Sequence, residues 1–371
     1  MKIICDREKL LRAFQVAASV SPLHSPKPVL RNVKIVADEA ATVLMGTDLE
    51  IGIRTEAQGV EVVAPGQALL PIDRFGSILR ESGDEKLTIE DDGKRIIVQG
   101  VRSQFQLPSE DPAQFPSVNS FHEEGYYEMP APFFRELIRR TIFSTDTESS
   151  RYALGGVLVE FSGEEVVGVA TDGRRLAKQS GATKIVGQQA TLGGATIIPT
   201  RAMQLIDRAI ADNDETIRIS AKDNEVLINS KTSTINARLV EGRFPSWQAV
   251  FPQDDNLTKI DIVVGPFYAA VRQAAIVTST ERRGVDFIFG EGKVALSGHG
   301  AELGESHIEL PIAYDGAEIK VKLDPRFFSD FLKVLQPEAT FTIAIKDSKT
   351  AAVCSTADGY AYVIMPLSQK N

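Results

Sequence analysis

The sequence predicts an α+β fold made of three copies of one unit, in which antiparallel sheet dominates. The order strand, helix, strands, helix, strands recurs three times along the 371 residues. Each copy also closes on an aromatic residue or Met followed by Pro, at 115–116, 244–245 and 365–366. A chain of this length suits two or three domains better than one core. We therefore expect domains at residues 1–118, 125–250 and 258–371.

The first copy begins with the strand-like run Met1–Cys5, and Asp6 follows as a candidate N-cap. Apolar residues then recur with the spacing of an amphipathic helix; they are Leu10, Leu11, Phe14, Ala17 and Ala18. A second short helix opens near Asp73, and its apolar face is Phe75, Ile78 and Leu79. Strand-like runs with turn residues between them fill the rest of the copy.

The second and third copies repeat this order with second helices beginning near residues 200 and 324. The predicted helical windows are 6–20, 72–82, 131–142, 200–213, 265–284 and 325–336. Polar segments containing Pro, Gly or acidic residues, at 117–125 and 251–258, are plausible linkers.

Two similar hairpin signals fall in corresponding contexts of the first and second copies. Thr171-Asp172-Gly173 lies between two strand-like runs, and Thr47-Asp48 lies between two others. Asp-Gly between alternating apolar residues favours a tight turn, because Gly adopts positive φ without strain. By this pattern alone, Arg174 and Arg175 would be two solvated residues after a surface turn.

Positive charge is concentrated in the predicted helices. The six windows together are net positive, although the whole chain carries −9. The cations that lie opposite the apolar stripes are Arg7, Arg12, Arg74, Arg135, Arg139, Arg201, Arg208, Arg272, Arg326 and Lys333. If all six helices face one direction, they form a cationic lining that contacts phosphates without reading bases. The predicted nucleic-acid binding is sequence-independent and sensitive to salt.

Enzymatic motifs are missing from the sequence. There is no G-x-x-x-x-G-K-[ST] loop, and His122-Glu123-Glu124 lacks the second His of a zinc helix. Gly290–Ala295 fits G-x-G-x-x-A but lies between two strand-like runs, so a hairpin turn explains it better. Cys5 and Cys354 lie inside strand-like runs and are expected to be buried small hydrophobes. We expect neither catalysis, nor a cofactor, nor a metal.

No apolar run approaches the roughly 20 residues of a membrane helix. Charged residues follow the first Met almost at once, so the pattern of a signal peptide is missing. The expected location is the cytoplasm, without contact to a membrane.

Five segments, taken together and in order, resemble the bacterial β sliding clamp family, the processivity factors of the replicative DNA polymerase. They are Gly46–Glu50, Arg151–Gly156, Ala170–Leu176, Glu241–Pro245 and Tyr362–Leu367. The resemblance extends over essentially the full chain. It implies a head-to-tail homodimer ring of six similar domains, with antiparallel sheets outside and helices lining a central hole for duplex DNA. Arg151 and Tyr152 then join the helix cations as expected DNA-binding residues.

The resemblance also implies a hydrophobic cleft between the middle and last domains that takes a short linear peptide from each client. Its walls would be Leu154, Thr171, Gly173, Arg174, Arg175, Leu176, Pro245, Val250, Val363, Met365, Pro366 and Leu367. The implied clients are the DNA polymerase III alpha subunit, the clamp loader, other polymerases and repair proteins. For the dimer, Phe105 and Leu107 of one subunit would meet Ile276 and Val277 of the other.

The sequence departs from the family pattern at three places. Arg174 stands where many relatives have His, and the tail Ser368–Asn371 lacks the Arg found near the end of some relatives. Gly298-His299-Gly300 replaces Thr-Asp in the third copy, so a second peptide cleft is not expected there. Two alternatives stay open: a paralogous clamp for repair or drug resistance, and a repeat scaffold that binds peptides without DNA.

Overall fold

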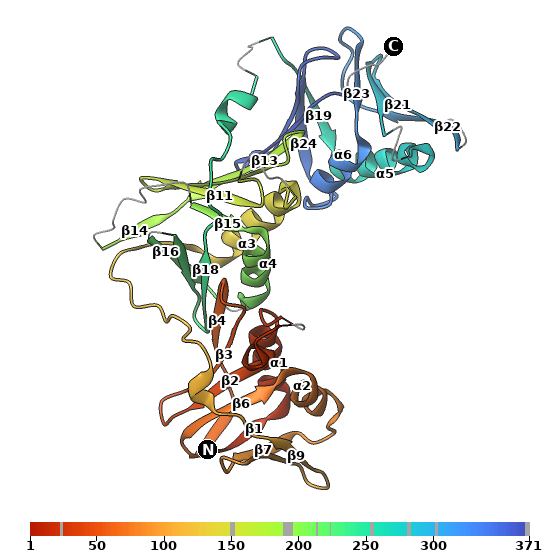
Figure 1. Ribbon diagram of the computed structural model, residues 1–371. Coiled ribbons are helices and arrows are strands. Elements are labelled where there is room, and N and C mark those ends of the chain that lie inside the picture. The colour runs from red at the N-terminus through yellow and green to blue at the C-terminus, as the bar shows by residue number, and fades with distance from the viewer. Residues whose placement is uncertain are drawn as a thin grey trace. The chain divides into compact units, whose positions relative to one another are not determined.

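The computed structural model describes residues 1–22, 25–148, 153–187, 196–212, 214–222, 224–252, 256–279, 283–300 and 303–367. The chain divides into two compact units. The first unit comprises Met1–Arg135 and Lys184–Val240, and the second comprises Glu136–Thr183 and Glu241–Asn371. Each unit is therefore assembled from two separate stretches of chain. Figure 1 gives the element labels used below.

Fourteen strands of the first unit form two sheets in which the neighbouring strands are antiparallel. The strands are β1 (Lys2–Asp6), β2 (Asn32–Ala37), β3 (Thr42–Thr47), β4 (Ile51–Glu56), β5 (Val60–Ala64), β6 (Gly66–Pro71), β7 (Lys86–Asp91), β8 (Arg95–Gln99), β9 (Gln104–Pro108), β10 (Tyr126–Pro130), β14 (Lys184–Val186), β16 (Thr216–Lys222), β17 (Glu225–Asn229) and β18 (Ser233–Arg238). Their orders are β5-β1-β7-β8-β9 and β14-β10-β16-β17-β18-β4-β3-β2-β6. The second order joins distant segments, because Ile235 of β18 lies opposite Ile53 of β4. A further strand, β15 (Thr196–Pro199), contacts β18.

The second unit repeats this antiparallel plan. Its strands are β11 (Gly156–Ser162), β12 (Glu165–Thr171), β13 (Arg175–Ala182), β19 (Thr258–Val263), β20 (Val285–Gly290), β21 (Lys293–Gly300), β22 (Gly304–Pro311), β23 (Ile319–Leu323), β24 (Thr340–Ile345), β25 (Ala352–Ser355) and β26 (Tyr360–Ile364). One sheet contains the run β11-β12-β13-β26-β25-β24-β19, and the other has the order β22-β21-β20-β23. The predicted predominance of antiparallel sheet is confirmed.

Six α-helices occur in the described chain, two for each predicted copy of the unit. They are α1 (Arg7–Ala18), α2 (Ile72–Glu81), α3 (Ala131–Thr141), α4 (Thr200–Ala209), α5 (Val264–Ala274) and α6 (Pro325–Leu332). All six lie within the predicted windows apart from the first residue of α5. Short 3₁₀ turns are η1 (Pro28–Arg31), η2 (Pro112–Gln114), η3 (Ile142–Ser144), η4 (Trp247–Val250) and η5 (Ala275–Val277).

The helix starts follow from local capping. The Asp6 carboxylate accepts a hydrogen bond of 3.0 Å from the Lys9 amide at the start of α1, as the sequence predicts. In α6, the Asp324 carboxylate accepts a hydrogen bond of 3.0 Å from the Arg326 amide, and Pro325 occupies the first helical position. Both caps satisfy amides that the helix itself leaves without a partner.

The buried face of α1 differs slightly from the predicted stripe. The helix buries Leu10, Ala13, Phe14 and Ala17, whereas Leu11 and Ala18 are partly exposed. A period of 3.6 residues places Ala13 at the centre of the face and moves Leu11 to its flank. Its neighbour in space is α2 (Figure 1), and Phe14 lies 5.1 Å from Phe75 between ring centroids.

Close approach of α1 to the sheet depends on Gly46 in β3. A Cβ atom at this position would lie 2.0 Å from the Ala17 carbonyl oxygen and 2.9 Å from a Val20 methyl group. Real Cβ contacts are longer than these distances, so only glycine at position 46 allows α1 to pack this close to β3.

We expect Gly46→Ala to destabilise the protein by about 2 kcal/mol, because overpacking forces α1 away from β3. Thermal unfolding followed by circular dichroism measures the loss. Gly83→Ala is the matched control: no atom lies within 4 Å of its added Cβ, and its φ is not positive. Equal melting temperatures for the two variants would contradict the close-packing account.

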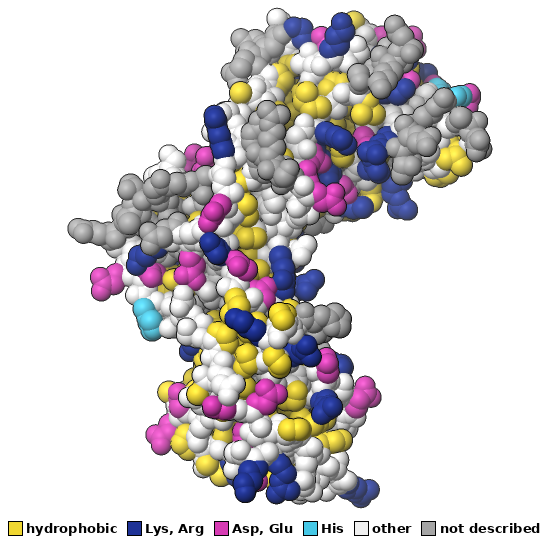
Figure 2. All heavy atoms as spheres, viewed as in Figure 1, with side chains coloured by type: hydrophobic (Ala, Val, Ile, Leu, Met, Phe, Trp, Pro, Cys, Tyr) yellow, Lys and Arg dark blue, Asp and Glu magenta, His cyan; other side chains and the backbone are white. Residues whose placement is uncertain are grey.

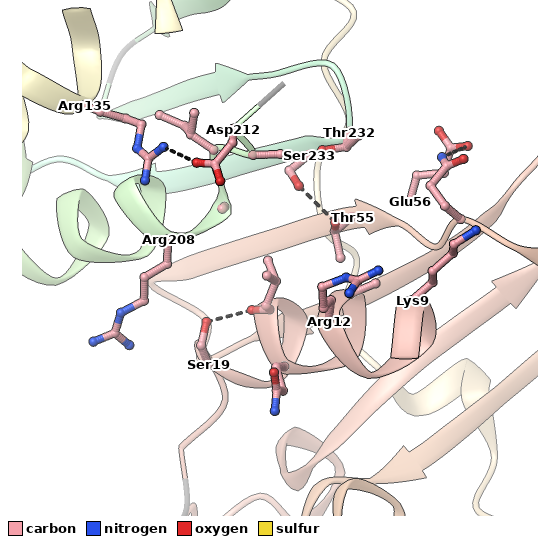
Figure 3. A pocket seen from close by; sticks show the side chains of 17 residues that line it. Lys9, Arg12, Ser19, Thr55, Glu56, Arg135, Arg208, Asp212, Thr232 and Ser233 are labelled. Carbon is pink, nitrogen blue, oxygen red and sulfur yellow. Dashed lines mark hydrogen bonds and ion pairs between the residues drawn. The ribbon is translucent and has the colours of Figure 1, made fainter. Parts of the chain in front are cut away.

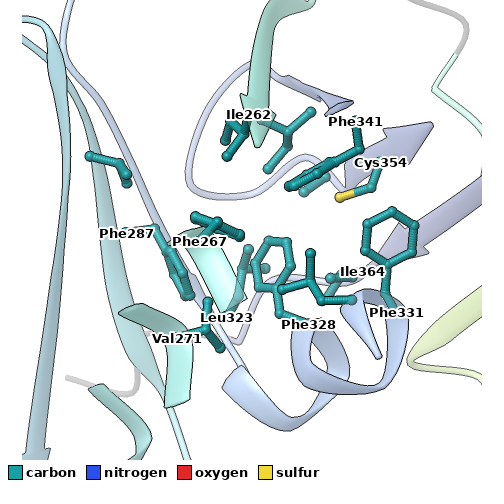
Figure 4. Packing of buried hydrophobic residues seen from close by; sticks show 14 of the residues in the cluster. Ile262, Phe267, Val271, Phe287, Leu323, Phe328, Phe331, Phe341, Cys354 and Ile364 are labelled. Carbon is teal, nitrogen blue, oxygen red and sulfur yellow. The ribbon is translucent and has the colours of Figure 1, made fainter. Parts of the chain in front are cut away.

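Aromatic rings dominate the core of the second unit. Phe267 of α5 has ring-centroid distances of 5.3 Å to Phe328 of α6 and 5.6 Å to Phe341 of β24. Phe331 stacks on Tyr362 of β26 at 5.2 Å. Figure 4 shows these phenylalanine rings converging between the helices and the strands. Each well-placed ring pair adds about 0.5–1.5 kcal/mol beyond its buried area, so α5 and α6 are held firmly to the sheet.

Candidate functional site

The hairpin between β12 and β13 has a fixed geometry that follows from its sequence. Thr171 Oγ1 donates to the Arg175 carbonyl at 2.7 Å and accepts from the Gly173 amide at 3.0 Å. Asp172 Oδ1 accepts from the amides of Arg174 and Arg175 at 2.9 and 3.0 Å. Gly173 has a φ of 82°, the left-handed conformation that the Asp-Gly pattern predicts.

The Thr47-Asp48 hairpin in the first unit makes the same set of bonds. Thr47 Oγ1 donates to the Ile51 carbonyl at 2.8 Å, and Asp48 Oδ1 accepts from the amides of Glu50 and Ile51 at 3.0 and 2.7 Å. Here a non-glycine residue, Leu49, takes the left-handed conformation with a φ of 83°. Identical bonding at two positions supports the internal repeat.

The pairing of β13 with β26 brings two distant groups of predicted cleft residues together. Arg175 lies opposite Ile364, and Leu176 lies opposite Val363. The ladder continues past the strands, because the Met365 amide donates to the Arg174 carbonyl at 2.9 Å. Residues about 190 positions apart therefore lie side by side in one continuous sheet.

Alternation along the strands sorts these residues into two faces. Ala177, Tyr362 and Ile364 belong to the aromatic core. Leu176, Val363 and Met365 have the opposite parity and lie on the other face. Leu176 and Val363 are fully buried there, whereas 42% of Met365 is exposed. We name Leu176, Val363 and Met365 the apolar face.

The segment that carries Pro245 and Val250 packs beside β11 and β13. Between these two residues, Trp247 donates from Nε1 to Glu160 of β11 at 3.0 Å. Its ring lies 5.6 Å from the Lys178 ammonium, and Lys178 is two residues from Leu176 on β13. Trp247 is therefore on the same side of the sheet as the apolar face. It is also the only tryptophan of the chain, which makes it a reporter for this site.

Arg175 is a partly buried anchor rather than a solvated turn residue. Its guanidinium bonds Asp172 at 3.0 Å, Asp330 of α6 at 2.6 Å and the Phe143 carbonyl at 2.6 Å. The guanidinium also lies 4.6 Å from the centre of the Phe327 ring, a cation–π distance. The solvated reading of Arg175 is therefore wrong, because charged and aromatic partners surround its side chain. Arg174 is exposed, and no described residue pairs with its side chain.

Electrostatics keep Arg175 charged. Burial alone would lower the pKa of this guanidinium, but its contacts with the carboxylates of Asp330 and Asp172 outweigh burial and raise the pKa. Burial has the opposite effect on the neighbouring Tyr362 hydroxyl, whose pKa it raises above its ordinary value. Arg175 therefore connects the hairpin to α6 at every physiological pH.

Leu154, the remaining wall residue before β11, is buried, and its carbonyl accepts from the Asp146 amide at 2.9 Å. At the other end of the predicted cleft, Pro366 and Leu367 are partly exposed. The Leu367 amide donates to the Lys322 carbonyl at 2.9 Å. All twelve predicted wall residues thus belong to the second unit.

The predicted DNA-binding cations of the first unit fall into two groups. Arg7, Arg135 and Arg201 are bound internally; Arg201, for example, contacts Asp48 Oδ2 at 2.7 Å and the Val20 carbonyl at 2.8 Å. The guanidinium groups of Arg12, Arg74 and Arg208 have no hydrogen-bond or ion-pair partner among the described residues. In the view of Figure 2, cationic and anionic side chains are intermixed on this unit.

The cations of the second unit have neighbours of their own. Arg326 bonds Asp324 at 2.6 Å, and Lys333 lies 3.7 Å from Asp330. Arg272 lies 5.6 Å from the centre of the Tyr268 ring, and Arg139 is exposed. The two remaining predicted DNA contacts, Arg151 and Tyr152, lie outside the described residues, as does the tail Ser368–Asn371.

The predicted dimer residues lie at or beside free sheet edges. Phe105 and Leu107 are on β9, the last strand of its sheet, and Phe105 is exposed while Leu107 is buried. Ile276 and Val277 are in η5, which contacts the edge strand β22; 75% of Ile276 is exposed. Unpaired strand edges with exposed apolar residues are association sites.

Several site residues were not predicted from the sequence. Asp330 and Phe327 hold Arg175, and Trp247 orders the Pro245–Val250 segment, yet none was named as part of the cleft. The isolated Trp between Pro245 and Val250 was a usable signal. Nothing in the sequence indicated the role of Asp330, because that role depends on a partner 155 residues away.

Within the described ranges, no group of three or more His, Cys, Asp or Glu residues is placed to hold a metal ion. Over the same ranges, no helix has both the length and the apolar character needed to cross a membrane. Cys5 and Cys354 are buried free cysteines, as predicted, and burial raises the pKa of the Cys5 thiol to about 12.

Three copies of an α+β unit with two helices each, together with cationic helices and an apolar face on paired strands, define the class of sliding clamps. Comparison with known proteins agrees. Models of the N-terminal, central and C-terminal domains of the DNA polymerase III beta subunit match residues 1–119, 128–246 and 248–368. The chain belongs to the DNA polymerase III beta subunit family.

Full-length relatives and solved structures are similar to the whole chain. The beta sliding clamps of Escherichia coli K12 and Haemophilus influenzae are each 27% identical over 99% of this chain and 100% of their own length. The crystal structure of the Bacillus subtilis clamp has a TM-score of 0.91 at 22% identity and covers 100% of both chains. A Pseudomonas aeruginosa clamp bound to griselimycin has a TM-score of 0.90 at 25% identity, covering 99% of both. The protein is thus a processivity factor, a subunit without catalysis of its own.

Proposed function

We propose that this chain encircles duplex DNA as a head-to-tail homodimer and tethers the replicative polymerase beside its template. The observation that carries the proposal is the apolar face, which lies next to Trp247 and includes an exposed Met365. A flexible, polarisable side chain at an apolar surface suits an adaptable groove for short peptides. Tethering raises the effective concentration of the polymerase at the template without a new catalytic group.

The proposed peptide cleft is the set of twelve wall residues in the second unit. Its proposed clients are the DNA polymerase III alpha subunit, the clamp loader, other polymerases and repair proteins. The exposed Arg174 side chain, which no described residue neutralises, places a positive charge beside the exposed Met365. The proposed location of the protein is the cytoplasm.

The proposed DNA contacts are the helix cations together with Arg151 and Tyr152. Long cationic side chains on helices suit phosphates and read no bases, so binding is independent of sequence. The proposed domains are residues 1–118, 125–250 and 258–371. For ring closure we propose that Phe105 and Leu107 meet Ile276 and Val277 of a second copy, because both groups lie at or beside free sheet edges.

Retention on circular DNA tests encirclement. We expect the full-length protein, loaded by its cognate clamp loader with ATP, to stay on a circular plasmid during gel filtration. Linearising the plasmid should release it, because a ring can slide off an end. Equal retention on circular and linear plasmid would mean ordinary electrostatic binding, and loss from both would favour a peptide scaffold without DNA.

A further inference from the structure

The outer edge of the four-stranded sheet in the second unit is charged. Along β22, Ile308 and Leu310 face inward and pack against the aromatic core. The residues that alternate with them are exposed on the other face; they are Glu305, His307 and Glu309. Because β22 is the last strand of its sheet, this charged row borders an unpaired edge.

The two histidines of the second unit both lie on this outer face. His299 of β21 lies opposite Glu305, and its Nδ1 atom is 2.9 Å from a carboxylate oxygen of that residue. His307 lies opposite Ser297, with Nδ1 at 3.2 Å from the hydroxyl oxygen and Nε2 at 3.4 Å from a Glu309 oxygen. The histidine side chains are 62% and 63% exposed, so both rings exchange protons with solvent.

The other charged groups of this face keep a constant charge near neutral pH. They are Lys293, Glu305, Glu309, Asp286, Lys320 and Lys322; Glu302, in the same hairpin, lies outside the described residues. The Lys293 ammonium is 2.6 Å from Glu309 and holds the pKa of that carboxyl below its ordinary value. Asp286 is 3.6 Å from Lys320. Among the described groups, only His299 and His307 therefore change charge between about pH 5.5 and 8.

In the proposed ring, this edge faces β9 of a second copy. Phe105 and Leu107 on β9 are proposed to meet Ile276 and Val277 of η5, and η5 contacts β22. Both β9 and β22 are the last strands of their sheets. Close approach of these two apolar groups therefore brings the two unpaired edges together.

Two arginines flank β9, and one of them is unpaired. Arg95 of β8 is 3.7 Å from Asp92. Arg102, in the turn that precedes β9, is exposed, and its guanidinium has no hydrogen-bond or ion-pair partner among the described residues. In the same turn, the Asp84 carboxylate accepts a hydrogen bond from the Val101 amide at 3.2 Å. Arg102 is therefore the exposed, unpaired charge of this edge.

The charge of the β22 edge reverses with the histidines. When both rings are neutral, Glu305 and Glu309 outnumber Lys293, so the edge is net negative and attracts Arg102. When both rings are protonated, the two added charges make the edge net positive. A positive edge repels the Arg102 guanidinium, and like charges across an interface oppose association.

We propose that His299 and His307 make closure of the ring depend on pH, so that acid opens it. The occupant of the β22 edge is a second copy of this chain, which means that the inference rests on the proposed head-to-tail dimer. The open form binds more protons than the closed one. The dimer dissociation constant therefore rises as the pH falls through the range in which imidazoles ordinarily titrate, about 5.5–7.5.

The proposed DNA contacts of the first unit do not share this sensitivity. A hollow of about 820 Å³ between α1 and α4 (Figure 3) contains several of them. Its charged lining residues are Lys9, Arg12, Arg135, Arg208, Glu56 and Asp212. No histidine is among the described residues that line it, so its charge stays constant over the same pH range. Acid should therefore act on ring closure and not on these contacts.

The test measures the dimer dissociation constant of the labelled full-length chain by fluorescence-detected sedimentation, at constant ionic strength and at several values between about pH 5.5 and 8. His299→Gln/His307→Gln removes the titration, and His299→Lys/His307→Lys makes the positive charge permanent. His122→Gln, an exposed histidine of the first unit, is the matched control. All substituted side chains are exposed, so the variants are expected to fold; circular dichroism melting at each pH checks this.

We expect the dissociation constant of the wild type and of His122→Gln to rise about tenfold between pH 8 and 5.5. The double Gln variant should change less than about twofold over this range. The double Lys variant should dissociate about tenfold more readily than the double Gln variant at pH 8 already. In a second arm, protein loaded on circular plasmid at pH 8 should be released on a shift to pH 5.5, whereas the loaded double Gln variant should stay.

The same acid response in the wild type and in the double Gln variant would overturn the proposal. A double Lys variant that dimerises as tightly as the wild type at pH 8 would overturn it as well. A dimer that is stable and independent of pH would leave the head-to-tail ring intact and remove only the role of the histidines. A wild type that stays monomeric at pH 8 would overturn both proposals.

Discussion

Met365→Asp is expected to lower the affinity for a client peptide by about a hundredfold. Met365 is the exposed member of the apolar face, beside the buried Leu176 and Val363. When the peptide binds, its apolar anchor would cover position 365 and bury the carboxylate of the introduced Asp without a partner. Burying an unpaired charge costs binding free energy. The nearby Arg174 would recover little of this cost, because exposed ion pairs contribute at most about 1 kcal/mol.

The measurement is fluorescence anisotropy with a labelled peptide from the cognate DNA polymerase III alpha subunit, supported by the emission of Trp247. Val263→Asp is the matched control, because Val263 is 46% exposed in the same unit and Met365 is 42% exposed. Val263 is also the N-cap of α5, a position where Asp is favoured, so the control should fold well. Equal affinities for the two variants would show that peptides bind elsewhere.

Arg175→Met is expected to reduce the free energy of unfolding of the second unit by about 3 kcal/mol. The substitution keeps the apolar stem but leaves the carboxylates of Asp172 and Asp330 without their shared cation. Breaking a fully buried ion pair from one side typically costs 3–5 kcal/mol, and the loss here should lie at the lower end of that range because 30% of the Asp330 side chain is exposed. The link between the hairpin and α6 would also be lost, so peptide affinity should fall with stability.

Urea unfolding followed by Trp247 fluorescence reports on this unit, because Trp247 is the only tryptophan and lies within it. Arg174→Met, one residue away, is the control: its side chain is exposed and has no described partner, so a change below about 0.5 kcal/mol is expected. A similar midpoint for both variants would mean that Arg175 is not an anchor.

Much of the fold could be predicted from the sequence because its signals are local. Apolar spacing located six helices, Asp6 marked the first N-cap, and Thr-Asp pairs marked two hairpins with the same hydrogen bonds. Each of these features depends on residues within about four positions of one another. The order of elements then indicated three copies of one unit, and the excess of cations on the helices pointed to phosphate contacts.

The cleft was predicted only through resemblance to a family, since strand alternation does not reveal which strands pair. Leu176 and Val363 share a face only because β13 lies beside β26. Side chains alternate with the same period of two along every strand. The sequence of either strand therefore does not indicate that its partner lies about 190 positions away.

The sequence by itself determined the helices, the turns, the repeated unit and the cationic character of the helix faces. Only the tertiary structure decided which cations are free. Arg175 looked like a solvated turn residue and is a partly buried anchor, because folding brings Asp330 of α6 to it. Arg12 and Arg208 looked like any other helix arginine, yet no described residue forms a hydrogen bond or an ion pair with either guanidinium. Whether a charge is neutralised depends on contacts between distant segments, and those contacts exist only in the folded chain.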